Sequence, residues 1–391
     1  MKTVFAETIR KQAAIALSLA VLTMTPVFCQ ERQASDKKYE IEFTNVADTT
    51  KGFSGFGNFP AINNHGDIAF TADRNGVGPG VFEVRGQEKV TTVASGLDGL
   101  TFFADSVAVN SAGVVAFAAT TATGSLAIFK GDGGPRTLIA DSIANGLNKL
   151  GLGAPSINAA GTVAFSAVLA QRGSPAAVFT ANGGPLRTVV STTSSDFASF
   201  LNVAINDAGT VVFPANRKDG STGVFTLGTT LVDIVDTNGH PEFDSFGDPV
   251  INNAGTVADQ ASLLPFDLPE IITGTAHGIT PRSNPANPAF KSLEHPSLNN
   301  RNAVAFSAIP SFFGDTSPTG IFLEVSGGQS LIPVVRPGDK LFGSTVDHVD
   351  LGRFALNDRF QMAFSYTLTD GRSGVAIASF NGEQEGDEMF L

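Results

Sequence analysis

Two segments of the sequence concentrate the residues that could do chemistry, and the first spans residues 236–248. It reads DTNGHPEFDSFGD, with oxygen and nitrogen donors at alternating positions. The candidate metal ligands are Asp236, Asn238, His240, Glu242 and Asp244. Closely spaced oxygen ligands suit a hard cation such as Ca²⁺. The segment lacks the complete EF-hand pattern, however, and Asp-x-Asn-Gly is common in solvated turns, so turn formation is the favoured interpretation.

The second segment, residues 336–350, reads RPGDKLFGSTVDHVD and contains a candidate acid/base cluster. The candidate catalytic residues are Asp339, Asp347, His348 and Asp350. A histidine beside carboxylates can move protons if this inter-blade connection folds over the mouth of a channel. Charged side chains of a surface loop are more commonly just solvated, and we expect that arrangement here.

The common catalytic motifs are missing from the sequence. It contains no G-x-S-x-G, no Walker-type phosphate loop, no H-E-x-x-H and no complete EF-hand loop. The stretch GFSGFG at residues 52–57 resembles a nucleophile motif only superficially, and we expect a flexible connection there. The single cysteine, Cys29, excludes an intramolecular disulfide and a cysteine-ligated zinc site. We therefore predict no cofactor, with Ca²⁺ at residues 236–244 as the alternative.

An internal repeat indicates which elements position these segments. Seven copies of one phrase begin at Asn63, Asn110, Asn158, Asn206, Asn252, Asn299 and Asn357. Periods in the forties are typical of one four-stranded propeller blade per repeat. Glycine stands three positions after the asparagine in five copies, as a hairpin turn with positive φ requires. Phe360 takes that place in the last copy, so we expect a different turn there.

The strand after each turn has faces of different size. Phe165 stands on a face of large apolar residues, whereas its neighbour Ala164 stands on a face of alanines, and the other copies repeat this pattern. Since neither face is polar, each sheet must be covered on both sides. Around a ring, the phenylalanines of one blade can pack on the alanines of the next. Asp259 interrupts the pattern and marks either a local defect or a specialised blade.

The ends of the repeat region indicate how the ring closes. After Asn357 the chain has room for strands near 361–367 and 373–380, but it shows no clear fourth strand. The stretch YEIEFTNV at residues 39–46 precedes the first repeat and resembles an edge strand. We therefore predict an all-β, seven-bladed β-propeller of four-stranded antiparallel blades over residues 39–382, with the N-terminal strand completing the last blade. An open β-solenoid or a string of small sandwiches is the alternative.

The first 30 residues have the order of parts of a secretory signal peptide. Basic residues precede an apolar stretch at 13–27, which is short for a membrane span. We predict a signal peptide at 1–30, a linker at 31–38 and an acidic tail at 383–391. The mature protein is then secreted, periplasmic or held at the cell surface, without a membrane span. The alternatives are an uncleaved anchor and acylation of Cys29, although the large Phe28 before it argues against acylation.

Charge and aromatic content restrict the partners. The formal net charge is −12 and no long basic run occurs, so we expect no nucleic-acid partner. The sequence has no Trp and two Tyr, so aromatic platforms that stack sugars are scarce. The partner is then a protein or a surface glycan, with the glycan disfavoured, and we expect a monomer.

The phrase Asn-x-x-Gly-x-x-Ala-Phe occurs as NNHGDIAF (63–70), NSAGVVAF (110–117) and NAAGTVAF (158–165). It closely resembles the tandem repeat of the bacterial choice-of-anchor NxxGxxAF-repeat proteins. The resemblance implies an exported protein with a C-terminal anchoring segment, but the acidic tail departs from that pattern because it has no hydrophobic stretch. The resemblance implies no catalytic residues.

Two functions follow from these observations. The favoured one is a secreted or cell-surface binding or scaffold module for an unidentified ligand, without enzymatic activity. The alternative is an extracellular hydrolase or lyase with a carboxylate/histidine site on the propeller face that carries the inter-blade connections. The alternative predicts that at least two of the candidate carboxylates and histidines lie within hydrogen-bond reach in one cavity.

Overall fold

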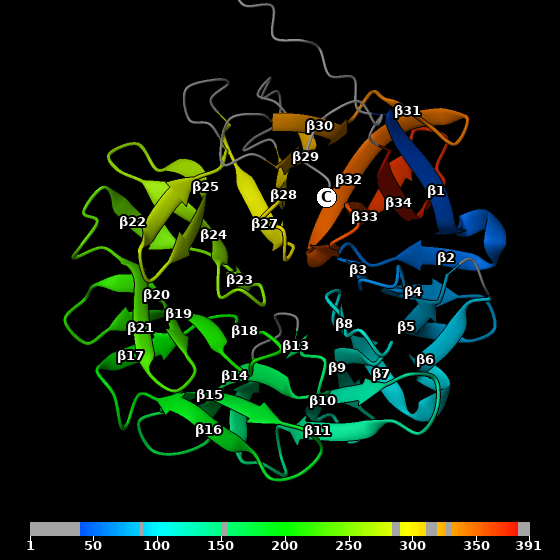
Figure 1. The fold of residues 1–391 in the computed structure, drawn as a ribbon. Helices are drawn as coiled ribbons and strands as arrows, with labels where there is room; N and C mark the ends of the chain where they lie inside the picture. Colours follow the sequence, from blue (N-terminus) through cyan, green and yellow to red (C-terminus); the bar gives the residue numbers. More distant parts are fainter. Residues whose placement is uncertain are drawn as a thin grey trace, which may run out of the picture. The chain divides into compact units, whose positions relative to one another are not determined.

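The computed structural model describes residues 40–86, 89–150, 155–283, 290–309, 319–325 and 331–381. The predicted signal peptide (1–30), linker (31–38) and acidic tail (383–391) lie outside the described residues. The described residues form seven antiparallel sheets around a central axis, which confirms the seven-bladed β-propeller (Figure 1). No helix in this described part of the chain is long and apolar enough to cross a membrane.

The first five blades share one construction, in which the inner strand is divided into two short segments. Both segments pair with the second strand, and the third and fourth strands follow outward. The first three blades consist of β2 (Phe53–Phe56), β3 (Ala61–Ile62), β4 (Ile68–Arg74), β5 (Gly78–Val84) and β6 (Thr91–Ser95); β7 (Leu100–Phe103), β8 (Ala108–Val109), β9 (Val115–Thr121), β10 (Leu126–Gly131) and β11 (Thr137–Asp141); and β12 (Leu147–Leu150), β13 (Ser156–Ile157), β14 (Val163–Leu169), β15 (Ala176–Ala181) and β16 (Arg187–Ser191).

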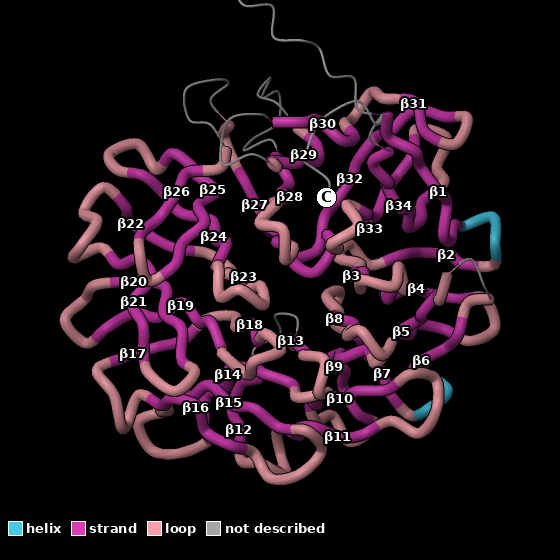
Figure 2. The backbone as a smooth tube through the Cα atoms, viewed as in Figure 1, coloured by secondary structure: helices cyan, strands magenta, loops and turns pink. Residues whose placement is uncertain are grey.

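The fourth and fifth blades are built in the same way, and the sixth has an undivided inner strand. The fourth blade consists of β17 (Phe197–Phe200), β18 (Ala204–Ile205), β19 (Val211–Arg217), β20 (Thr222–Leu227) and β21 (Leu231–Asp236), and the fifth of β22 (Phe243–Phe246), β23 (Val250–Ile251), β24 (Val257–Leu263), β25 (Leu268–Thr275) and β26 (Gly278–Pro281). The sixth consists of β27 (Leu293–Leu298), β28 (Val304–Ala308), β29 (Gly320–Glu324) and β30 (Leu331–Val335). Two short 3₁₀ turns, Thr49–Lys51 and Gly96–Asp98, lie at the outer rim (Figure 2).

The seventh blade joins the two ends of the repeat region. It contains β31 (Lys340–Leu341), β32 (Ser344–Leu356), β33 (Gln361–Leu368), β34 (Ser373–Asn381) and β1 (Glu40–Asp48). The pairing of β1 with β34 is antiparallel and runs from Glu40 opposite Asn381 to Asp48 opposite Gly374. This pairing confirms that the N-terminal strand completes the last blade. Because β1 pairs with β34, the backbone groups along that edge of β34 are not left unpaired.

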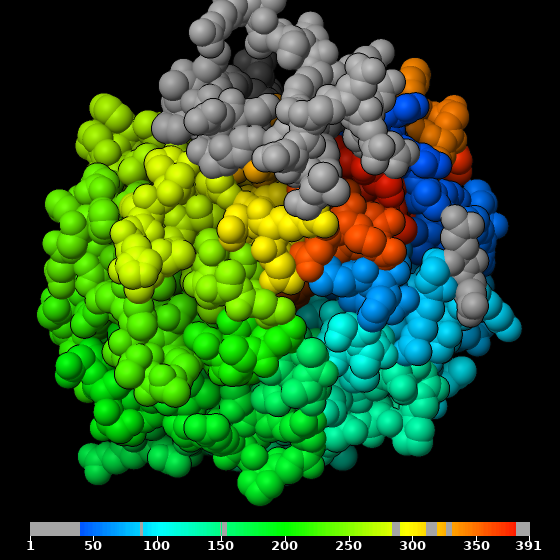
Figure 3. All heavy atoms as spheres, in the orientation of Figure 1, coloured from blue at the N-terminus to red at the C-terminus, as the bar shows by residue number. Residues whose placement is uncertain are grey.

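The blades pack as the sequence predicted, phenylalanine face against alanine face. Phe117 and Ala69 belong to one buried cluster across the junction of the first two blades. Phe70 and Ala363 belong to another across the closure of the ring. Each such phenylalanine contributes up to about 3 kcal/mol by burial. The blades therefore stack as contiguous sectors around the ring (Figure 3).

The stretch at residues 52–57 is a strand rather than the expected flexible connection. It forms β2, and Phe53 packs edge-on against Phe82 with ring centroids 5.4 Å apart. A register shift between Phe53 and Gly55 adds one residue to the strand. Because of this bulge, Phe53 and Phe56 lie on the same side, with centroids 5.0 Å apart, although they are three positions apart. The bulge interrupts the alternation of apolar and polar residues by which a strand is normally recognised in a sequence.

The expectation of a different turn at Phe360 is also wrong. Phe360 adopts φ 55° and its backbone N–H donates to the carbonyl of Asn357 at 3.1 Å. Gly66 makes the corresponding bond to Asn63 in the first repeat. The left-handed conformation costs a residue with a side chain about 1–2 kcal/mol. Phe360 is 5% exposed, and burial of its ring offsets that cost.

The blade packing gives a testable prediction. Phe213 is fully buried between blades, so Phe213→Ala should lower the free energy of unfolding by about 3–5 kcal/mol. Phe102 is 53% exposed, and Phe102→Ala, the matched control, should cost about 1 kcal/mol or less. Urea or guanidinium unfolding followed by circular dichroism measures both. Equal losses in the two variants would contradict the interlocking of the blades.

Candidate functional site

A ring of hydrogen bonds between the repeat asparagines surrounds the central channel at one end, which we call the asparagine end. Each of the seven asparagines is 2–5% exposed. The Nδ2 atom of each one donates to the backbone carbonyl of the corresponding asparagine in the next blade, at 2.9–3.2 Å. Asn357 completes the ring by donating to Asn63. The ring thus ties every blade to its neighbour.

The same side chains also fix their own hairpins. The Oδ1 atom of Asn206 accepts the backbone N–H of Thr210 at 3.0 Å, and Asn63 accepts those of His65 and Asp67, both at 2.9 Å. These amide oxygens thus serve as acceptors within their own turns. The repeated asparagine is therefore a structural residue.

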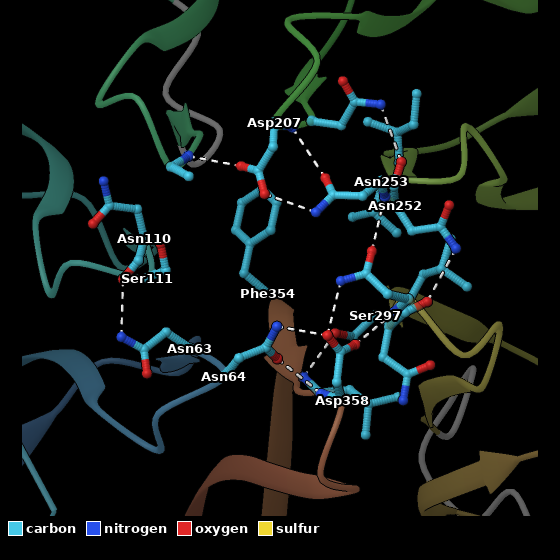
Figure 4. Close-up of a pocket in the computed structure, with 18 of the residues that line it drawn as sticks. Asn63, Asn64, Asn110, Ser111, Asp207, Asn252, Asn253, Ser297, Phe354 and Asp358 are labelled. Carbon is cyan, nitrogen blue, oxygen red and sulfur yellow. Dashed lines mark hydrogen bonds between the residues drawn. The ribbon is translucent and has the colours of Figure 1, made fainter. Parts of the chain in front are cut away.

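The residues that follow the asparagines form a second, more exposed circle. These residues are Asn64, Ser111, Ala159, Asp207, Asn253, Asn300 and Asp358. Asp358 accepts the Nδ2 of Asn64 at 2.6 Å and the Nδ2 of Asn300 at 2.8 Å, and Asp207 accepts the Nδ2 of Asn253 at 2.7 Å. Figure 4 shows these contacts around the mouth of the channel. Amides and carboxylates are thus held in fixed positions there.

Two side chains of β32 close the channel below this circle. The inner strand of the seventh blade shifts register between Leu351 and Leu356, and residues 352–355 are left out of the pairing with β33. Arg353 is 3% exposed, and its Nη2 donates to the backbone carbonyls of Val203, at 3.2 Å, and Pro249. Phe354 packs against buried clusters from both halves of the ring. Together they form a strap across the channel.

A pocket of about 180 Å³ lies between the second circle and the strap. Asn and Asp side chains surround its mouth, and apolar residues that precede the asparagines, such as Ile62 and Ile205, line its wall. Arg353 and Phe354 also line it, and the Phe354 ring projects among the turns in Figure 4. Fixed polar groups around an apolar interior are typical of small-molecule sites.

A second group of polar residues lies farther along the channel from the asparagine end. They precede their repeat asparagines by four to seven positions, and they are Asp248, in the break between β22 and β23, Glu294 and His295 on β27, and Asp350 on β32. His295 has φ 52°, and its ring lies 4.4 Å from that of Phe59. Burial lowers the pKa of His295. Sequence reasoning missed this group, because its members come together only when the inner strands are placed around the axis.

Asp259 belongs to the same neighbourhood and explains the break in the fifth repeat. Its side chain is buried, and one oxygen accepts the backbone N–H of Gln260 at 2.8 Å. Burial raises its pKa well above the usual value, while the positive charge of Arg353 opposes that shift. The fifth blade is thus specialised to place a carboxyl group near the strap.

The candidate metal ligands at residues 236–244 do not converge. Asp236 accepts the backbone N–H groups of Asn238, at 3.1 Å, and Gly239, at 2.7 Å, as in the expected turn. His240 contacts Glu242 at 3.0 Å, whereas Asp244 lies exposed on β22. Within the described ranges, no three His, Cys, Asp or Glu side chains are placed to hold one metal ion. The Ca²⁺ site stays a prediction.

The candidate catalytic residues separate into two places. Asp347, His348 and Asp350 lie on β32 and not in a connection, as had been expected. His348 Nε2 lies 3.0 Å from Asp350 Oδ2, and this hydrogen bond raises the pKa of His348. Asp339 instead contacts Arg336, whose backbone N–H it accepts at 2.8 Å. One histidine–carboxylate pair is therefore formed, and neither of its members lines the pocket at the asparagine end.

Sequence reasoning also missed Arg353 and Phe354. The signal was present in the spacing, because 58 residues separate Asn299 from Asn357, whereas the other repeats are 46–48 residues apart. The phrase GRFAL before Asn357 departs from the other copies as well. An inserted segment in one repeat is a reasonable place to look for a function that the repeat itself lacks.

The family of the chain follows from its sequence. A family model described as a family of unknown function, DUF7453, matches residues 45–270. The chain belongs to this family. Among curated proteins, none matches the sequence. Membership in DUF7453 therefore identifies a lineage and assigns no activity.

Solved structures similar to this DUF7453 chain are propellers of low sequence identity. The β-propeller domain of the Trilobed protease from Pyrococcus furiosus, described as having an open velcro topology, has a TM-score of 0.53 at 7% identity, over 85% of this chain and 96% of that one. An acylaminoacyl peptidase from Pyrococcus horikoshii has 0.53 at 6%, over 80% and 49%. A prolyl endopeptidase has 0.52 at 10%, over 85% and 51%. The DUF7453 chain spans about half the length of these two peptidases, and the likeness shows the fold alone.

The asparagine ring yields a prediction on stability. Asn206→Ala removes the buried bond to Asn252 and leaves the partly buried N–H of Thr210 without its acceptor, which should cost about 2–3 kcal/mol of unfolding free energy. Asn216, on β19 of the same blade, is exposed, so Asn216→Ala should change stability by about 0.5 kcal/mol or less. Chemical denaturation compares the two. Similar small losses would show that the ring contributes little.

The two channel histidines should titrate on opposite sides of the ordinary histidine pKa. NMR titration should place His348 above about 6.5 and His295 below it. The bond to Asp350 stabilises the protein most fully below the pKa of the unfolded chain, and this contribution is lost as the pH rises through the raised native pKa. Asp350→Asn should lower the midpoint of His348. An unchanged midpoint would contradict the pairing.

Proposed function

We propose that this protein is an exported binding module, without enzymatic activity, that takes a small polar ligand into the pocket at the asparagine end. The pocket itself is the observation that carries this proposal. Its polar groups are held in place by hydrogen bonds, and Asp358 alone accepts three of them, from Asn64 and Asn300. A ligand would therefore meet groups that need little ordering, which favours binding.

Binding fits this pocket better than catalysis does. No histidine lines it among the described residues, and its carboxylates already accept amide hydrogens. General acid–base catalysis most often uses a histidine. The charged groups at the mouth are better suited to recognising a ligand than to moving its protons.

The proposed location outside the cytoplasm depends on the N-terminal segment. The order of basic and apolar residues at 1–30 supports export, and the likeness to exported NxxGxxAF-repeat proteins agrees with it. Amino-terminal sequencing of the protein recovered from culture medium, periplasm and cell envelope tests this location. A chain that retains residue 1 in the cytoplasmic fraction would refute export.

One contact supports the alternative function, a hydrolase or lyase. His348 and Asp350 form a hydrogen-bonded pair, and the negative charge of Asp350 also acts on Glu294 in the neighbouring blade. A proton-transfer site in this part of the channel would use His348 as base, held by Asp350. If the protein hydrolyses or eliminates any substrate, His348→Ala should abolish turnover and Ser111→Trp, at the other end of the channel, should not.

Blocking the pocket tests the binding function. Ser111 is exposed on the turn of the second blade and lines the pocket, so Ser111→Trp should fill it without disturbing the core. Ser111→Ala is the matched control. A thermal-shift screen of amino acids, amino sugars, short peptides and oligosaccharides should find compounds that stabilise the wild type and Ser111→Ala but not Ser111→Trp. Ligands that stabilise all three proteins equally, or no ligand in any class, would overturn the proposal.

A further inference from the structure

The pocket at the asparagine end has opposite charges at its two ends. Asp207 and Asp358 stand on the turns at the mouth, while Arg353 lies in the strap. Arg353 reaches the carbonyl of Val203, which precedes Asn206 by three residues on the inner strand. Three strand residues span roughly 10 Å. The positive and negative groups are therefore separated along the channel axis.

Arg353 carries a buried charge without an ion-pair partner, although its guanidinium lies over the Phe354 ring. It is 3% exposed, its Nη2 donates to two backbone carbonyls, and its Nε and Nη1 have no hydrogen-bond partner among the described residues. The negative charges of Asp248 and Asp259 act on it from a distance, but neither carboxylate forms an ion pair or hydrogen bond with it. A buried cation without such a partner is costly. A ligand oxygen that reaches the strap would supply the missing acceptor.

The mouth offers the complementary charge. The carboxylate of Asp207 accepts the backbone N–H of Ala159 at 2.7 Å and the side chain of Asn253, and Asp358 is held by Asn64 and Asn300. These donors are all neutral amides, so the two negative charges are positioned without being neutralised. A primary ammonium group provides both the charge and several N–H donors.

The middle of the pocket is apolar and small. Phe354, Ile62 and Ile205 line it. Its volume of about 180 Å³ resembles that of the engineered cavity of about 150 Å³ that holds a benzene molecule. A short methylene chain between two charged ends fits these dimensions.

From this arrangement we propose that the pocket binds a small linear zwitterion, with its ammonium group at the mouth that carries Asp207 and Asp358, its carboxylate at Arg353 and its chain against Phe354. This inference rests on the proposed binding function and names the ligand class of the same pocket. An amine without a carboxylate would leave Nε and Nη1 of Arg353 without an acceptor, and a carboxylate without an amine would meet two negative charges at the mouth. Both ends are therefore needed for strong binding.

Isothermal titration calorimetry with 6-aminohexanoate tests the inference, with 4-aminobutyrate and 8-aminooctanoate as length variants. Hexylamine, hexanoate and 6-aminohexanamide each remove one charge, and each should bind at least tenfold more weakly than 6-aminohexanoate. The amide probes the Arg353 end without a substitution in the core. Asp207→Asn should weaken 6-aminohexanoate at least tenfold, whereas the matched control Asp73→Asn, at an exposed position of β4 outside the pocket, should leave its affinity unchanged.

The possible outcomes distinguish failure of the zwitterion inference from failure of the proposed binding function. Equal binding of hexylamine and 6-aminohexanoate, abolished by Ser111→Trp, would overturn the zwitterion while supporting a ligand site in the pocket. Binding of 6-aminohexanoate that persists in Ser111→Trp would overturn the assignment to this pocket. If no ω-amino acid binds while another class passes the Ser111→Trp screen, the inference fails and the binding function stands. If no ω-amino acid binds and no other class passes the screen, both the zwitterion inference and the proposed binding function are wrong.

Discussion

The bond from each repeat asparagine to the carbonyl of the next one is the interaction on which the rest of the structure depends. The same amide holds its own hairpin through Oδ1 and the neighbouring blade through Nδ2. Hairpin geometry and blade spacing are thus set by one side chain. Each such bond contributes only about 1 kcal/mol net. Its larger effect is positional, since it fixes where the following residue, such as Asp207 or Asp358, points at the channel mouth.

Sequence alone predicted the parts of this fold that repetition makes visible. The spacing of the asparagines, the alternation of Phe165 with Ala164, and the edge-strand character of residues 39–46 were enough for the blade number and the closure. Local exceptions were not predictable in the same way. A bulge in β2 conceals the pairing of Phe53 with Phe56, and the buried ring of Phe360 lets it occupy a position that glycine fills elsewhere.

The candidate site was harder to predict, because sequence motifs reveal only polar residues that lie close together in the chain. Local clusters such as residues 236–244 form turns, in which the carboxylate of Asp236 is occupied by backbone N–H groups. The groups that meet in the channel come from different blades and are nearly fifty residues or more apart, as Asp248 and His295 are. Only the assembled ring brings equivalent positions together. In a repeat protein, residues at equivalent positions of different repeats can therefore form one site, although they lie far apart in the sequence.

The seventh blade links closure of the ring to closure of the channel. Its β34 pairs with β1, and its β32 supplies the Arg353–Phe354 strap, which reaches the inner strands of the fourth and fifth blades through Val203 and Pro249. A ligand held between Arg353, Asp358 and Asp207 would connect the seventh blade to the fourth by a second route. A ligand that binds only the closed ring stabilises the closed ring. Binding of such a ligand would therefore also oppose separation of β1 from β34. The blade that closes the ring is thus also the one that supplies the strap.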